Sequence, residues 1–64
     1  MRREIKIRLL ERDMQVPDLA KKIGRSGGYL SRALNDKVKL RTDEAFAIAD
    51  ILNLSNEQVR EFFG

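Results

Sequence analysis

The sequence predicts an all-α domain built from five short helices. Apolar residues recur at the 3.6-residue spacing of helices that bury one face. The one proline is Pro17, and the glycines are Gly24, Gly27, Gly28 and the last residue, so helix-breaking residues fall between the periodic segments. At 64 residues the chain is expected to form a single domain, residues 1–64, with a small core.

The first two helices are expected at about Arg2 to Asp13 and from near Pro17 to Gly24. Proline suits a first helical turn, because its missing N–H would be unpaired there in any case. Glycine suits the end of a helix, where the chain turns left-handed. The residues expected to face inward are Ile5, Leu9 and Leu10, with Ile7 at the margin, followed by Leu19, Ala20 and Ile23.

The third helix is expected to begin after Ser26, a natural N-cap, and to end near Asn35, which tolerates a left-handed conformation. The fourth opens at Thr42 with Asp43 and Glu44 in its first turn, where negative charge meets the positive end of the helix dipole. It carries so many apolar residues that we expect it to be central. The fifth starts at Ser55, with Gln58 placed to complete a capping box. The apolar residues of these helices are Leu30, Ala33 and Leu34, then Ala45, Phe46, Ile48, Ala49, Ile51 and Leu52, and finally Val59 and Phe62.

The composition argues against an enzyme. Cysteine and histidine are absent, so the chain lacks a thiol nucleophile, thiolate ligands, the commonest general base and the commonest zinc ligand. We therefore expect no catalytic residue, metal site, cofactor or small-molecule substrate. No apolar run approaches the ~20 residues that span a bilayer, and no signal-peptide apolar block follows the basic N-terminus. A cytoplasmic protein without membrane contact is expected.

The charge is distributed unevenly along the chain, although the net value is only +3. Residues 21–41 carry seven basic side chains and one acidic side chain, whereas residues 42–64 carry one basic and five acidic. This pattern indicates one surface that faces a polyanion and another that is turned away from it. A mixed solvated surface that keeps the protein soluble is the other interpretation of the same pattern.

The stretch from Val16 to Asn35 has the spacing of two short helices that cross steeply. Ala20 is small enough for a close crossing, and Gly24 allows the positive φ that turns the second helix across the first. Leu30, six residues after Gly24, then returns to pack beneath the first helix. The N-terminal half of the second helix is left protruding, as in a helix that enters a DNA major groove.

Three pieces of the sequence, LAKKIG, YLSRALN and AFAIADILNLS, stand in the order and spacing of one known family. The chain resembles the lambda-repressor-like helix-turn-helix proteins of the phage repressor and Cro type (XRE-like) from about Gln15 to Leu54, and more loosely over its whole length. The resemblance implies a five-helix lambda-repressor-like DNA-binding domain. Its helix-turn-helix would be formed by the second and third helices, with the third as the recognition helix.

The resemblance places the base-reading positions on the N-terminal half of the recognition helix, at Gly27, Gly28, Tyr29, Ser31 and Arg32. Arg32 is the strongest candidate, because a guanidinium pairs in a bidentate way with guanine O6 and N7. A phosphate contact or a solvated side chain is the alternative for Arg32, and Tyr29 either contacts DNA or covers the turn. The candidates for phosphate contact are Arg25, Ser26, Asn35, Lys37, Lys39 and Arg41.

The sequence departs from the family pattern at the starts of both helices. Val16 and Pro17 occupy positions where many members have glutamine, and Gln15 lies one residue early. Gly27 and Gly28 occupy positions where relatives often place polar readers. Two interpretations follow: the missing side chains let the backbone approach DNA, or the pair is a flexible lead-in to a helix that starts later.

The expected function is a sequence-specific transcriptional regulator of double-stranded DNA, similar to small phage or mobile-element Cro-like repressors. One recognition helix covers about half a turn of DNA, so we expect a homodimer on DNA, with Phe63, Ile51 and Leu54 as candidate contacts. A protein-interaction module of the antirepressor type is one alternative. An architectural or recombination-accessory DNA binder on the same fold is another.

Overall fold

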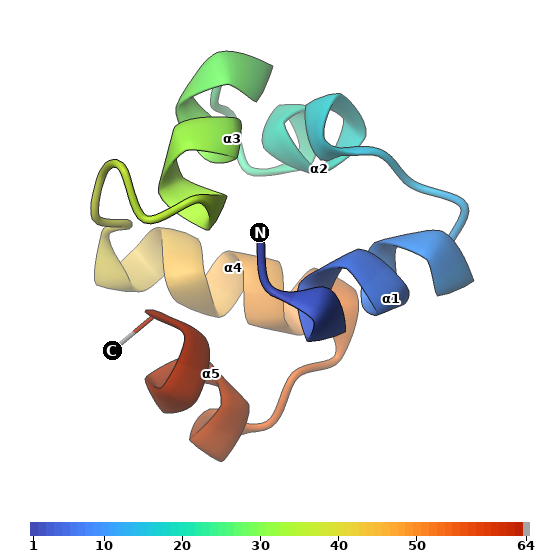
Figure 1. Cartoon of the computed structure of the whole chain (residues 1–64), viewed down its shortest axis with the longest axis vertical. Helices are drawn as coiled ribbons and strands as arrows, with labels where there is room; N and C mark the ends of the chain where they lie inside the picture. Colours follow the sequence, from blue (N-terminus) through green and yellow to red (C-terminus); the bar gives the residue numbers. More distant parts are fainter. Residues whose placement is uncertain (64) are drawn as a thin grey trace.

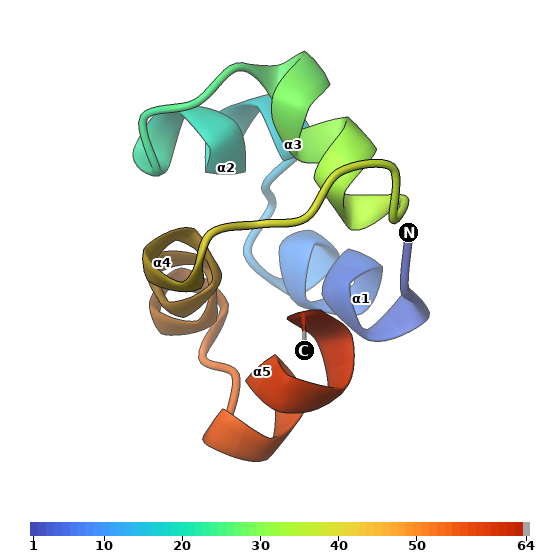
Figure 2. The same ribbon diagram turned by 90° about the vertical axis from the view of Figure 1, so that its left-hand side faces the viewer.

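Five helices and the short segments that join them make up residues 1–63, which are the residues that the computed structural model describes. The helices are α1 (Arg3–Glu11), α2 (Val16–Lys22), α3 (Gly27–Leu34), α4 (Thr42–Leu52) and α5 (Asn56–Phe63). No strand occurs in residues 1–63, and the predicted all-α class is confirmed. Helix α4 crosses the middle of the view in Figure 1 and lies at one edge of the view in Figure 2. In both views α2 and α3 lie on one side of it and α5 on the other.

The core forms around α4, as its surplus of apolar residues predicts. Ile48 and Leu52 are fully enclosed and belong to a cluster to which every other helix contributes. Ala45 and Ala49 of α4 pack instead against Val59 of α5. More than one side of α4 is therefore buried, which explains why its apolar residues do not follow a narrow stripe. The largest fully buried side chains outside α4 are Ile5, Leu19 and Leu30, one from each of α1, α2 and α3.

Three helices begin with a side chain at the third helical position that accepts a hydrogen bond from the backbone N–H of the N-cap residue. Asp18 accepts from Gln15 at 2.9 Å, Glu44 from Arg41 at 3.2 Å, and Gln58 from Ser55 at 2.9 Å. Ser55 also accepts from the backbone N–H of Gln58 at 3.1 Å, which completes the predicted capping box. These bonds satisfy N–H groups that a helix start leaves without a helical partner.

Helices α1 to α4 end in one common backbone motif. A residue just past each helix is left-handed, namely Asp13, Gly24, Asp36 and Asn53, with φ of 54°, 75°, 61° and 58°. The N–H of the next residue then donates to the carbonyl five residues back, from Met14 to Leu9, Arg25 to Ala20, Lys37 to Arg32 and Leu54 to Ala49, at 2.9, 2.9, 2.8 and 2.8 Å. This geometry is the Schellman closure, and the predicted left-handed turn at Gly24 is confirmed.

Two expectations about single residues are wrong. Leu10 is 68% exposed, because Ile5 and Leu9 define the buried face of α1 and the residue after Leu9 lies about 100° further round the helix. Helix α3 ends with Asn35 as its C-cap, as expected, but Asn35 has an ordinary negative φ of −101°, and the left-handed residue is Asp36, one position later. In addition, Phe46, counted among the apolar residues of α4, is 51% exposed.

We expect Gly24→Ala to lower the free energy of unfolding by about 1–2 kcal/mol, the cost of holding an L residue left-handed. An added Cβ meets no atom within 4 Å at Gly24, so crowding does not contribute. Gly28→Ala is the matched control. Gly28 is the second residue of α3 and its Cβ would make only an ordinary contact with Arg32, so a small gain, at most about 0.5 kcal/mol, is expected. Urea unfolding followed by circular dichroism measures both; equal effects in the two variants contradict the assignment of strain to Gly24.

Candidate functional site

Helix α3 starts at the first glycine of its glycine pair and not after it. The hydroxyl of Ser26 accepts a hydrogen bond from the backbone N–H of Tyr29 at 3.1 Å, which confirms Ser26 as the N-cap. Gly27 and Gly28 are the first two helical residues, so the interpretation of the pair as a lead-in to a later helix is wrong. A Cβ on Gly27 would lie 3.5 Å from the Cα of Pro17, and one on Gly28 would lie 3.6 Å from Nη1 of Arg32. Both are ordinary contacts, so space alone does not require glycine here.

One exposed stripe runs along α3 on the side away from the core. Gly28, Ser31, Arg32 and Asn35 are exposed and follow the i, i+3, i+4, i+7 spacing of one helix face. The alternating buried residues are Leu30, Ala33 and Leu34, as predicted. The stripe therefore brings together three of the five predicted base-reading residues, Gly28, Ser31 and Arg32. The other two are half-buried, Gly27 beside Pro17 and Tyr29 towards α4.

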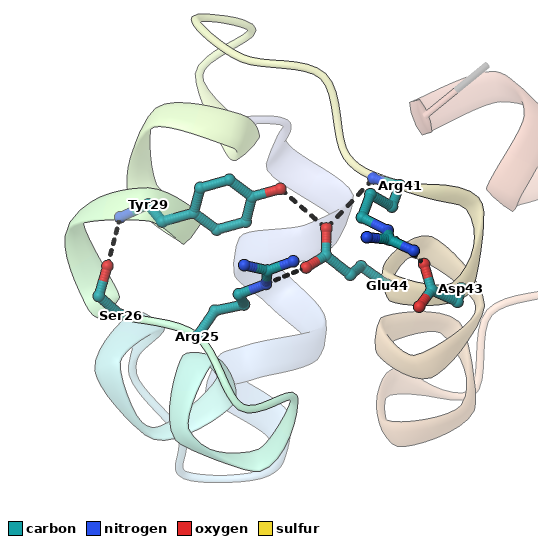
Figure 3. A network of polar contacts seen from close by, with 6 residues as sticks. All are labelled: Arg25, Ser26, Tyr29, Arg41, Asp43 and Glu44. Atoms are coloured by element: carbon teal, nitrogen blue, oxygen red, sulfur yellow. Dashed lines mark hydrogen bonds and ion pairs between the residues drawn. The ribbon is translucent and has the colours of Figure 1, made fainter.

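A buried carboxylate on α4 holds the start of α3. Glu44 is 5% exposed and is the one charged residue buried within residues 1–63. Its Oε1 accepts the hydroxyl of Tyr29 at 2.8 Å and the backbone N–H of Arg41 at 3.2 Å, while Oε2 accepts Nε–H of Arg25 (Figure 3). The guanidinium of Arg25 also lies over the ring of Tyr29, 5.1 Å from its centroid. Both carboxylate oxygens are thus bonded, and α3 is tied to α4 through the turn that precedes it.

These contacts shift the titration of all three side chains. The hydrogen bond from Tyr29, followed by those from Arg41 and Arg25, lowers the pKa of Glu44 despite the opposing effect of burial. The bond to Glu44, with burial and the negative charge of the carboxylate, raises the pKa of Tyr29. The same partner raises the pKa of Arg25. The network is therefore most stable when Glu44 is ionised and Tyr29 is protonated.

The six predicted phosphate-contact residues differ in how free their polar groups are. Lys37 and Lys39 are exposed in the segment between α3 and α4, and neither takes part in an ion pair within residues 1–63. Arg41 pairs with Asp43 at 3.3 Å, although both side chains stay about two-thirds exposed or more. The remaining three are already bonded: Arg25 to Glu44, Ser26 to the backbone of Tyr29, and Asn35 to the carbonyl of Ser31 and the N-terminal ammonium.

Sequence reasoning missed the second role of Glu44. It identifies Glu44 as an acidic residue in the first turn of a helix, where negative charge is favourable. The spacing between Arg41 and Glu44 also fits the bond that Glu44 accepts from the N-cap backbone. Its bonds to Arg25 and Tyr29 join residues 19 and 15 positions apart, and no local pattern indicates them.

The described residues show no group of three or more His, Cys, Asp or Glu side chains placed to hold a metal ion. Among residues 1–63, no helix is long and apolar enough to cross a membrane.

A family model of the Cro/C1-type HTH DNA-binding domain matches residues 4–63, which covers the chain from α1 to the end of α5. No curated protein and no solved structure matches the chain.

We expect the free energy of unfolding to fall at both ends of the pH range through the Glu44 network. Because the folded pKa of Glu44 lies below 4.5, its contribution is complete above that pH and is lost as the pH falls through the folded value. Because the folded pKa of Tyr29 lies above 10.0, its contribution is complete below that pH and is lost as the pH rises through the folded value.

Urea unfolding at a series of pH values, from the acid range in which Glu44 titrates to the alkaline range in which Tyr29 titrates, measures the effect. Glu44→Gln should flatten the acid side of the stability profile, and Tyr29→Phe should flatten the alkaline side. Asp50→Asn, at an exposed position of the same helix, is the control and should leave both sides unchanged. An acid side that is identical in Glu44→Gln and in the original chain would show that Glu44 does not govern it.

Proposed function

The chain belongs to the family of Cro/C1-type helix-turn-helix DNA-binding domains, and we propose that it is a sequence-specific repressor that reads the DNA major groove with α3. Membership of the family makes it a DNA-binding domain of the kind found in transcriptional regulators. The proposal that α3 reads bases in the major groove rests on three residues of the exposed stripe on α3, namely Gly28, Ser31 and Arg32. The stripe offers hydrogen-bonding groups on a helix face that no other part of residues 1–63 covers.

Base reading is assigned chiefly to Arg32. Its guanidinium lies beside Gly28, where an added Cβ would make an ordinary contact of 3.6 Å with Nη1. From the stripe, the guanidinium can donate to guanine O6 and N7, and the hydroxyl of Ser31 can bond to either type of base pair. Gly27 and Tyr29 are the other two of the five predicted base-reading residues. We assign neither a direct base contact, because both are half-buried and the Tyr29 hydroxyl is bonded to Glu44.

Phosphate contacts on either side of α3 would position the stripe in the groove. Lys37, Lys39 and Arg41 follow α3 closely in the chain and are exposed, which supports their assignment to one phosphate backbone. Ser26 precedes α3 and Asn35 follows it, so these two candidates lie at its two ends. Arg25 also precedes α3, but its charge is paired with Glu44, so we do not count it among the phosphate contacts. Such contacts fix orientation and affinity without reading sequence, which leaves discrimination to the stripe.

A homodimer on DNA is part of the proposal. The described chain measures 25 Å along its longest axis, whereas equivalent half-sites lie about 34–36 Å apart along the duplex. One chain therefore meets a single half-site, and a second copy is needed for the next. Ile51, Leu54 and Phe63 are half-buried, and their exposed parts are the proposed dimer contacts. We propose that the protein binds DNA in the cytoplasm. DNA binding of this kind needs no cofactor.

Titration against random-sequence duplex DNA, at about 50 and 200 mM salt, tests the proposal. Three phosphate contacts per chain predict a salt slope of about −2.7, or affinity about 40-fold weaker at the higher salt. Selection from a random duplex library should then yield a two-fold symmetric site that is bound more tightly than random DNA.

Each other outcome has a distinct meaning. Salt-sensitive binding without any selected site contradicts sequence specificity and favours an architectural DNA binder. No binding at about 50 mM salt contradicts DNA binding altogether and favours the protein-interaction module.

Arg32→Ala is expected to weaken binding to the selected site by about 1–3 kcal/mol, while binding to random duplex changes much less. Lys37→Ala is the matched comparison, because it should weaken both to a similar degree and lower the salt slope by about 0.9. Fluorescence anisotropy with both duplexes measures the two effects. Equal losses on both duplexes in Arg32→Ala would assign Arg32 to phosphate.

A further inference from the structure

Arg25 stands where a cation would normally add to DNA affinity. It lies in the turn that leads into α3, directly before the N-cap Ser26, so it adjoins the proposed DNA-facing stripe in the chain. Its Nε–H is nevertheless directed at Glu44, and its guanidinium rests on the ring of Tyr29 (Figure 3). The positive charge is therefore already balanced within the protein.

Tyr29 shows the same arrangement. It occupies a position at which the family places base readers, but its hydroxyl donates to Oε1 of Glu44 at 2.8 Å. Its side chain reaches towards α4, and the residue is half-buried. One carboxylate thus engages the polar ends of two residues that would otherwise lie beside the DNA.

We infer that Glu44 is a positioning residue that withholds Arg25 and Tyr29 from DNA and thereby limits non-specific binding. This inference rests on the proposed function, since it concerns how the same surface discriminates among DNA sequences. With Arg25 and Tyr29 held back, discrimination falls to Gly28, Ser31 and Arg32. Glu44 itself touches no base or phosphate in this scheme.

Counterion release explains why balancing one arginine matters. Each cation that neutralises a phosphate releases condensed counterions and steepens the salt dependence of binding by about 0.9. The Arg25–Glu44 pair has no net charge, so it adds nothing to this term. Because the relevant quantity for a regulator is affinity for its site relative to all other DNA, a smaller sequence-independent term improves discrimination.

The burial of Glu44 makes its ion pair with Arg25 hard for DNA to break. The Glu44 side chain is 6% exposed, whereas that of Arg25 is 42% exposed. If a phosphate drew Arg25 away, the carboxylate would stay buried with one partner fewer, and a buried charge without its partner is strongly unfavourable. The approaching phosphate would also add a second negative charge close to Glu44.

Glu44→Gln tests the inference with random-sequence duplex alone. The amide oxygen still accepts from Tyr29 and Arg41, but the charge that balances Arg25 is gone. We expect the salt slope to steepen by about 0.9 and affinity at about 50 mM salt to rise about tenfold. A merely structural role for Glu44 predicts weaker binding and an unchanged or shallower slope. Circular dichroism confirms that the variant is folded.

Arg25→Met identifies the cation responsible. It is made in the Glu44→Gln background alone, because in the original chain it would leave the buried carboxylate of Glu44 without its ion-pair partner. In the Glu44→Gln background it should return the slope to the original value, and this double variant leaves no buried charge unpaired. Lys37→Met is the control, and it should lower the slope by about 0.9 in both backgrounds.

The possible results separate the inference from the proposed function. If the original chain binds the duplex and Glu44→Gln has the same slope, the inference is overturned and DNA binding stands. A double variant whose slope stays as steep as that of Glu44→Gln also overturns it. If neither the original chain nor Glu44→Gln binds at about 50 mM salt, the proposed function fails and the inference fails with it.

Discussion

The close packing of α3 against α2 is the constraint on which the rest of the structure depends. Ala20 is fully buried, and its carbonyl accepts the N–H of Arg25 across the left-handed Gly24. A larger side chain at Ala20 would separate the two helices, and an ordinary φ at Gly24 would send α3 in another direction. The exposed stripe, the segment that follows α3 and the approach of Tyr29 to α4 all depend on that placement.

Burying Glu44 in so small a protein requires compensation that the structure supplies in full. A charged group removed from water is costly unless hydrogen bonds and an opposite charge replace the lost solvation. Glu44 has three such partners, one from the turn before α3, one from α3 and one from its own N-cap backbone. No buried side-chain polar atom of the described residues lacks a partner. The same bonds that compensate the charge fix the angle between α3 and α4.

The sequence predicts the fold more completely than it predicts the site. Helix starts and buried faces depend on residues within one or two turns, so Ser26, Ser55 and Gly24 indicate them directly. The apolar spacing predicts Leu10 on the buried face of α1, and this is wrong because the spacing does not show how narrow that face is. Glu44 was understood only as a helix-start residue, because its contacts with Arg25 and Tyr29 exist only once α2, α3 and α4 have packed. Local signals therefore establish the scaffold, and tertiary contacts decide which polar side chains remain available.

The repeated closure after α1, α2, α3 and α4 has a consequence for how fast the chain folds. Each closure is completed by residues at most five positions apart, at Asp13, Gly24, Asp36 and Asn53. Little loop-closure entropy is lost in ending a helix this way, so these closures add little to the barrier for folding. Chains dominated by such short-range contacts fold on the order of microseconds to milliseconds. A newly made copy would therefore be folded soon after synthesis. Transcription or translation, rather than folding, would limit how quickly the concentration of folded protein rises.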